Sequence, residues 1–185
     1  MRTIGSPRKV IDLYHQALSG EESDTLARRY SEPSGHRWGT GDVEIARVRL
    51  MDATGQERYV YEPGEAMSLR LSYKVHRLGG GPAVFGFAIT RADGVLVYGT
   101  NTQLDGLPSP ALGEQGEVII SLSRLDLVDG GYFIDVAVHS PDGVPYDYRS
   151  RCYPLSVRSG SKEQGLVRIA HSWRIEPGTS LDHTK

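Results

Sequence analysis

Three short clusters hold the side chains of this sequence that are best suited to ligand recognition. Aromatic rings stack on the apolar faces of sugars, and planar amide, carboxylate and guanidinium groups pair with hydroxyls. The chain carries ten tyrosines against three phenylalanines and two tryptophans, so its aromatic content is mostly amphipathic. This inventory favours a surface that binds a neutral, hydroxyl-rich ligand. The clusters are Tyr98, Asn101, Thr102 and Gln103; Asp135, His139, Tyr146, Asp147 and Tyr148; and His76 with Arg77, eleven candidate residues for carbohydrate binding.

Each of these residues also has an ordinary structural interpretation. Tyr98 and Tyr148 suit strand positions that pack across a sheet. Asn101 suits an Asx turn, in which its side chain hydrogen-bonds the backbone two or three residues further on. The residue types alone leave both interpretations open.

A catalytic interpretation needs two carboxylates, or a set of Tyr, His and Arg side chains, that converge in a cleft. Asp105, Asp135 and Asp147 are the candidate carboxylates, although turn and surface positions account for them better. Asp135 and His139 form the only pair that the sequence itself places together, on one face of a predicted strand. The chain has no G-x-S-x-G motif and no G-x-x-x-x-G-K-[ST] loop, so no catalytic residue is predicted.

Metal and cofactor sites are not predicted either. The six histidines include no i, i+4 pair on a helix and no H-x-H on a strand, so a zinc site is not expected. The single cysteine, Cys152, lies in a strand-like run and is interpreted as a structural thiol. Asp126, Asp129 and Asp142 suit a structural ion, but turn chemistry explains these aspartates equally well.

The composition is typical of one globular domain with extensions. The chain has 185 residues, of which 38% are hydrophobic and 24% charged, and such a chain is expected to form a packed core. A net charge of −2 and a pI near 6.3 argue against a nucleic-acid-binding protein, which would carry a basic stripe. No apolar run approaches the roughly 18–20 residues that span a bilayer, and the N-terminus lacks the apolar stretch of a signal peptide. A cytoplasmic protein without direct membrane insertion is therefore predicted.

The N-terminal part of the chain is predicted to lie outside the main domain. Residues 1–20 are predicted to form a short helix, with Ser6 at the N-cap and Gly20 at the end. The apolar stripe of this helix needs a partner surface, because one short helix cannot bury it alone. Residues 21–41 are polar and irregular, and they are predicted to form a linker or extended arm.

Residues 42–177 are predicted to form the main domain. Here the hydrophobic period changes to two, the spacing of half-buried strands. Short strands separated by Gly, Pro and Asp turns, without interleaved helices, predict an all-β fold, an immunoglobulin-like or jelly-roll-type sandwich of two sheets. Residues 178–185 are predicted to be a tail. The expected strands lie at about 43–50, 67–75, 83–91, 95–98, 118–122, 132–138, 144–148, 153–157 and 166–175.

Three local features refine this prediction. The apolar alternation changes phase near Ala46, which predicts a β-bulge. The pattern Leu127-x-x-Gly130-x-Tyr132 is typical of a tyrosine corner, in which a buried hydroxyl hydrogen-bonds the nearby backbone. The last strand follows a polar tether at 159–165, so it is free to pair within its own chain or with a partner chain.

In their order and spacing, several stretches resemble the C-terminal, carbohydrate-binding domain of Wzt-type ATPases. These are the ATP-binding subunits of ABC transporters that export O-antigen and related polysaccharides. The resemblance covers about residues 5–175. It is carried by Gly5-Ser6-Pro7-x-x-Val10-Ile11-x-x-Tyr14, RWGTGDVEI from Arg37, RADGV from Arg91, GTNT from Gly99, GYFIDV from Gly131 and His171-Ser172-Trp173.

The resemblance implies a function and a set of partners. It implies non-catalytic recognition of the exported polysaccharide, typically its non-reducing end, by a homodimer that exchanges its last strand. It also implies that the helix at 1–20 continues from an ATPase domain, and that a transmembrane transporter subunit holds the protein at the inner face of the inner membrane. No binding signature transfers residue by residue, so the candidate residues rest on their chemistry alone.

Two alternatives stay open beside glycan recognition. One is a structural domain that dimerises or positions an ATPase and binds no glycan. The other is an enzyme that acts on a polysaccharide, for which Asp135 and His139 are the nearest candidates.

Overall fold

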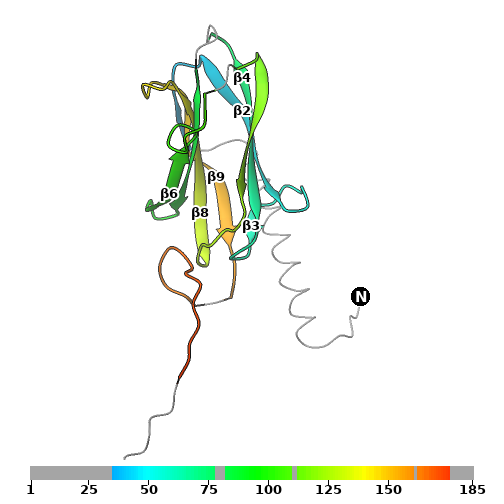
Figure 1. Cartoon of the computed structure of the whole chain (residues 1–185), viewed down its shortest axis with the longest axis vertical. Coiled ribbons are helices and arrows are strands. Elements are labelled where there is room, and N and C mark those ends of the chain that lie inside the picture. The colour runs from blue at the N-terminus through cyan, green and yellow to red at the C-terminus, as the bar shows by residue number, and fades with distance from the viewer. Residues whose placement is uncertain (1–34, 78–81, 110–111, 161, 176–185) are drawn as a thin grey trace, which may run out of the picture.

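The computed structural model describes residues 35–77, 82–109, 112–160 and 162–175, and these form a sandwich of two β-sheets (Figure 1). The predicted N-terminal helix, most of the predicted linker and the tail lie outside the described residues. The described residues contain nine strands and no helix, which confirms the all-β prediction. The strands are β1 (His36–Trp38), β2 (Val43–Asp52), β3 (Val60–Tyr61), β4 (Met67–Val75), β5 (Val84–Arg91), β6 (Leu96–Asn101), β7 (Gln115–Leu122), β8 (Gly130–His139) and β9 (Pro145–Val157).

The larger sheet has the strand order β1-β9-β8-β5-β6, and the smaller sheet has the order β2-β4-β7. All neighbours are antiparallel except the short β3, which pairs in parallel with the C-terminal part of β9. β9 is the longest strand, and it merges two strands that the sequence predicts separately. Because β1 and β8 flank β9, the outer face of the larger sheet is continuous from β1 to β6.

The core lies between the sheets and follows the predicted alternation. In β8, Tyr132, Ile134 and Val136 are buried in the core, whereas Asp135 and His139 belong to the opposite face. A face of buried Val, Ile and Leu on β2 and β4 covers the core from the other side. The period-two pattern therefore assigns most side chains of these strands to the correct face of the sheet.

Two predicted local features are confirmed. The register of β2 against β4 shifts between Ile45 and Arg47, which places the bulge at Ala46. The buried hydroxyl of Tyr132 donates a hydrogen bond of 2.9 Å to the carbonyl of Val128, as a tyrosine corner requires. A bulge and a tyrosine corner are both local devices, and this explains why short sequence patterns predict them.

The sheet begins earlier in the chain than the predicted boundary at residue 42. β1 lies in the predicted linker, and it pairs with β9 through His36, Arg37 and Trp38. The flanking glycines permit this contact, because a Cβ at Gly35 would lie 2.0 Å from the carbonyl oxygen of Ser150. The polar composition of the arm conceals the strand, because all three of its residues are exposed.

Residues 166–175, where the last strand is predicted, form no strand with the part of the chain that the structure describes. Only one isolated bridge joins this segment to the sandwich, from Val167 to Leu127, and the remainder has no strand partner among the described residues. Figure 1 shows the segment, in orange to red, running away from the ends of the sheets. Its alternating apolar side chains are exposed: Val167, Ile169, Trp173 and Ile175.

Candidate functional site

The outer face of the larger sheet carries a hollow of about 160 Å³ over β6, β5, β8 and β9. One row of side chains crosses this face in register. Asn101 pairs with Gly86, and Gly86 pairs with Ala137. Ala137 pairs with Tyr148, and Tyr148 pairs with Trp38. The row therefore has a polar end, a floor of two small residues and an aromatic end, and the small residues leave the space between the ends open.

Gly86 is the residue that keeps the hollow open at its floor. A Cβ at this position would lie 3.1 Å from Cβ of Asn101 and 3.2 Å from the carbonyl oxygen of Thr100. Ala88, on the next row of the same face, pairs with Gly99 on one side and with Asp135 on the other. The floor is thus built from glycine and alanine, and the polar groups stand around it.

The aromatic end is a stacked pair. The rings of Trp38 and Tyr148 lie 4.3 Å apart between centroids, with an interplanar angle of 16°. Trp38 remains 48% exposed, although its ring covers Tyr148. Burial, with a smaller contribution from the nearby Asp135 carboxylate, raises the pKa of Tyr148, so its phenol stays protonated and able to donate a hydrogen bond. A flat aromatic wall with a donor is suited to the apolar face and the hydroxyls of a sugar ring.

Asp135 supplies a carboxylate that is only 8% exposed. One carboxylate oxygen accepts a 2.5 Å hydrogen bond from the backbone N–H of Arg151, and the other accepts a 3.2 Å bond from the Thr90 hydroxyl. The Arg151 N–H reaches this carboxylate because the pairing of β8 with β9 is irregular opposite Asp135, and Arg151 has a φ of 56°. Two donors hold the carboxylate in place without neutralising its charge.

His139 and Asn101 complete the polar lining. The Nδ1 of His139 lies 2.6 Å from the carbonyl of Ser140 and donates to it, so the neutral ring presents Nε2 as an acceptor. The side-chain oxygen of Asn101 accepts a 2.7 Å bond from the backbone N–H of Leu104, which is the Asx-type turn. Its side-chain nitrogen makes no hydrogen bond to the described part of the chain. Asn101 therefore has a structural role and a donor that is available to a ligand.

The hollow brings together four of the eleven candidate residues, namely Asn101, Asp135, His139 and Tyr148. Tyr98 is a neighbour of Asn101 in the candidate cluster but lies on the opposite face, where its ring packs at 5.9 Å against Phe87. Tyr146 is partly buried and packs against the core. Alternation along the strands separates residues that are adjacent in the sequence.

The remaining residues of the loop cluster have local roles. The Thr102 hydroxyl accepts a 3.2 Å hydrogen bond from the backbone N–H of Phe85 and so anchors the start of the loop after β6. Gln103 is exposed in this loop. Neither side chain lines the hollow.

His76 and Arg77 lie elsewhere, at the end of β4 in the smaller sheet. The His76 Nε2 is 3.0 Å from a carboxylate oxygen of Glu44, and the Arg77 Nε donates to Asp42 at 3.1 Å. Both side chains are half or more exposed, and each pairs with a residue at or just before the start of β2. They tie the end of β4 to the start of β2, and neither lines the hollow.

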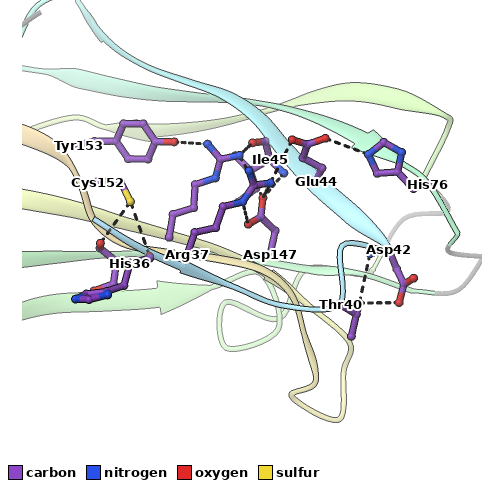
Figure 2. A network of polar contacts seen from close by, with 12 residues as sticks. His36, Arg37, Thr40, Asp42, Glu44, Ile45, His76, Asp147, Cys152 and Tyr153 are labelled. Atoms are coloured by element: carbon purple, nitrogen blue, oxygen red, sulfur yellow. Dashed lines mark hydrogen bonds and ion pairs between the residues drawn. The ribbon is translucent and has the colours of Figure 1, made fainter. Parts of the chain in front are cut away.

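Asp147 belongs to an ion network between the sheets (Figure 2). Its side chain accepts hydrogen bonds from Arg37, at 2.8 and 3.0 Å, and from the backbone N–H of Ile45 at 2.8 Å. Arg149 donates to the carbonyl of Ile45 and to the hydroxyl of Tyr153. Ile45 lies beside the bulge in β2, an edge strand of the smaller sheet, and this network supplies partners to its N–H and its carbonyl.

The candidate carboxylates do not form a catalytic pair in this structure. Asp135 faces outward from the larger sheet, whereas Asp147 is 2% exposed and faces the core. Asp105 accepts a hydrogen bond from Thr100 in the loop after β6. Burial raises the pKa of Cys152, so its thiol stays protonated, in agreement with a structural role.

Neither a metal cluster nor a membrane-spanning helix is found in the part of the chain that the structure describes. In residues 35–77, 82–109, 112–160 and 162–175, no three His, Cys, Asp or Glu side chains are placed to hold one metal ion. The same residues contain no helix of the length and apolar character that crossing a membrane requires.

The candidate residues predicted from residue types did not include Trp38 or the small residues of the floor. Trp38 lies in a polar, glycine-containing arm, and a lone tryptophan in such a segment is the signal that points to it. The floor is visible as the alternation in β5, in which Gly86 and Ala88 interleave with Phe85 and Phe87. Small residues at alternate positions of a strand mark a face on which space is kept open.

Comparisons with known proteins agree with this architecture. Residues 34–169 match the Wzt C-terminal domain family. The O-antigen export system ATP-binding protein RfbB of Myxococcus xanthus is 27% identical over 196 residues, which include 97% of this chain and 43% of RfbB. The chain thus spans less than half the length of that relative. The crystal structure of the C-terminal domain of Wzt has a TM-score of 0.69 and 21% identity, with 83% of this chain and 96% of that chain covered, and it has the same fold. Because the family match covers well over half of the sequence, the chain belongs to the Wzt C-terminal domain family.

Proposed function

We propose that this chain recognises a polysaccharide by binding one sugar residue in the hollow, without chemical change to it. The observation that carries the proposal is the row from Trp38 to Asn101, in which an aromatic wall and a polar end flank a floor of Gly86 and Ala137. The apolar face of a sugar ring would lie against the wall, and its hydroxyls would meet Asn101, Asp135 and His139.

The size of the hollow favours a single ring at the end of a chain. Its volume of about 160 Å³ is well below the roughly 300–1,000 Å³ of pockets for drug-sized ligands. A site of this size makes few contacts, and each sugar hydrogen bond replaces one to water at little net gain. We therefore expect weak binding at one site, which a dimer would strengthen through avidity.

The relatives suggest which polysaccharide is bound. RfbB of Myxococcus xanthus is an ATP-binding protein of an O-antigen export system, and this chain aligns with less than half of it. We propose that the ligand is an exported O-antigen, that its non-reducing end enters the hollow, and that an ATPase domain and a transmembrane transporter subunit are the partners. On this proposal the chain acts in the cytoplasm, at the inner face of the inner membrane.

The test is an NMR titration of the chain with the O-polysaccharide of its source organism. Saturable amide shifts in β5, β6, β8 and β9 are expected, and they should be lost with glycan that lacks its non-reducing terminal residue. Tyr148→Ala should abolish the shifts, whereas Tyr98→Ala, the same change on the other face of the sheet, should retain them. Shifts confined to His76 and Arg77, or none at millimolar sugar, would overturn the proposed site.

A second candidate function is dimerisation, and the C-terminal segment favours it. Val167, Ile169 and Trp173 alternate as in a strand, but their side chains are 51%, 74% and 86% exposed. An alternating apolar segment that has no partner strand among the described residues of its own chain is suited to pair with a second copy. Light scattering tests this, since Ile169→Glu should convert a dimer to a monomer while Glu163→Gln, in the tether, should leave the mass unchanged.

A further inference from the structure

The hollow has a charge of one sign. Among the described residues that line it, Asp135 is the only Asp, Glu, Lys or Arg. No ion pair joins its carboxylate to any described residue, and its two hydrogen bonds come from the uncharged donors Thr90 and the Arg151 backbone. A carboxylate thus faces the ligand space with its negative charge uncompensated.

Arg151, whose backbone N–H binds this carboxylate, uses its guanidinium in other contacts. The guanidinium of Arg151 lies over the ring of Phe133, 4.7 Å from its centroid, and its Nη2 donates to the carbonyl of Ala92 at 2.8 Å. These contacts direct the side chain toward the turn between β5 and β6. Only the backbone N–H of Arg151 therefore reaches Asp135, and the positive charge is committed elsewhere.

We infer that Asp135 makes the hollow select an uncharged sugar residue and reject an acidic one such as a hexuronic acid or a phosphorylated sugar. This inference rests on the proposed function, because it specifies the ligand of the same hollow. A hydroxyl donates to a carboxylate, whereas a second carboxylate or phosphate has no proton to share and is repelled. Two like charges about 4 Å apart in a partly buried site repel several times more strongly than they do in water.

The other polar groups of the hollow do not offset this selection at mildly alkaline pH. His139 uses Nδ1 to donate to Ser140, so its neutral ring has only an acceptor left for a ligand. Asn101 and Tyr148 supply neutral donors, and these suit a hydroxyl as well as a charged oxygen. The carboxylate therefore decides the preference between charged and uncharged ligands.

The experiment uses matched sugar pairs at pH 8 and low salt, where a surface imidazole is neutral and screening is weak. Each pair is a methyl hexoside and the corresponding methyl hexuronoside, which differ only in a hydroxymethyl or a carboxylate at C6. Dissociation constants are measured by NMR titration. The wild-type chain is expected to bind the neutral member of the best pair at least about tenfold more tightly, a difference of about 1.4 kcal/mol.

The decisive variant is Asp135→Asn. It keeps the shape of the side chain and both hydrogen bonds, because the amide oxygen accepts from the Arg151 N–H and the Thr90 hydroxyl accepts from the amide nitrogen. The preference for the neutral sugar should fall to about threefold or less. Asp126→Asn, which removes the same charge at a distant exposed position, should leave the preference unchanged, and amide spectra report whether both variants keep the fold.

The outcomes separate this inference from the proposed function. If both members of a pair bind equally, or if Asp135→Asn leaves the preference as it was, the charge selection is wrong and the binding site stands. If no member of any pair, and no O-polysaccharide, shifts the residues of the hollow, the proposed function fails and the selection fails with it.

Discussion

Two pairs of consecutive residues, Arg37-Trp38 in β1 and Asp147-Tyr148 in β9, divide between the two faces of one sheet. Trp38 and Tyr148 stack on the outer face beside the hollow, at 4.3 Å between ring centroids. Arg37 and Asp147 join on the inner face, at 2.8 Å between Nε and Oδ1. The same stretch of strand pairing therefore positions a ligand surface and a structural ion pair at once.

The two regions differ in how much each depends on its partners. The inner network is centred on Asp147 and Arg149, whose side chains are only 3% and 6% exposed, so the loss of one leaves the charge of the other buried and unpaired. The aromatic pair is partly exposed, and water replaces what is lost when one ring is removed. We therefore expect stability to depend on the inner face and binding to depend on the outer face.

The largest expected effect is from Asp147→Ala. The change leaves Arg149 buried without its carboxylate and leaves the Ile45 N–H without an acceptor, so the free energy of unfolding should fall by about 3–5 kcal/mol. Urea denaturation measures this. Tyr148→Ala is the matched control one residue away, and its loss should stay near the 0.5–1.5 kcal/mol typical of an aromatic pair. Equal losses in the two variants would contradict the division between the faces.

The next effect concerns binding through the aromatic wall. Trp38→Ala removes the ring that covers Tyr148, so affinity for the O-polysaccharide should fall about tenfold, with stability changed by about 1 kcal/mol or less. Titration followed by amide shifts gives the affinity. Arg37→Ala, the change at the neighbouring residue on the inner face, should show the reverse pattern. Its loss of stability should be larger than its loss of affinity.

A smaller effect is expected at the floor of the hollow. In Gly86→Ala the new Cβ lies about 3.1–3.2 Å from Asn101 and Thr100, so one of them must shift. We expect a loss of about 1 kcal/mol in stability, at the low end for added bulk in a packed site, and a severalfold loss in affinity. Urea denaturation and titration measure the two quantities. Gly99→Ala, on the edge strand of the same face, is a useful comparison, because its Cβ would meet Ala88 at 3.3 Å but would not stand between Asn101 and Tyr148.

The smallest effect is the acid sensitivity of Glu44, which accepts a 3.2 Å hydrogen bond from Arg37 of the ion network. Hydrogen bonds from His76 and then from Arg37 lower the pKa of Glu44 below its ordinary value of 4.5. A lowered pKa in the folded state stabilises the fold above the ordinary value, and this stabilisation is lost as the pH falls through the lower pKa. Because Glu44 is about one-third exposed, the effect should be modest.

Glu44→Gln tests this pH dependence. Denaturation midpoints from pH 6 down to pH 3 should fall less steeply in the variant than in the wild type, because the variant has no carboxylate to protonate at this position. If the two curves stay parallel throughout this range, Glu44 does not contribute to the acid sensitivity of the domain.

Local patterns of the sequence determined most of the sandwich. The period of two in β4 and β8 assigned inward and outward faces, the phase change near Ala46 located the bulge, and the spacing before Tyr132 located the tyrosine corner. Each of these features arises from neighbouring residues and the geometry of a strand, so one chain segment is enough to predict it. The position of Asp135 and His139 on one face of β8 has the same origin.

Only the tertiary structure decided which strands lie side by side, and the hollow depends on that. The row from Asn101 through Gly86 and Ala137 to Tyr148 and Trp38 joins residues from five strands, and no local pattern fixes their register. The pairing of β9 with β8 places Asp147 opposite Val138, on the face that is buried between the two sheets. The sequence thus determined which face of its own strand each residue occupies, because strand geometry is local. Tertiary packing decided which of these faces meet, because register between distant strands depends on the whole fold.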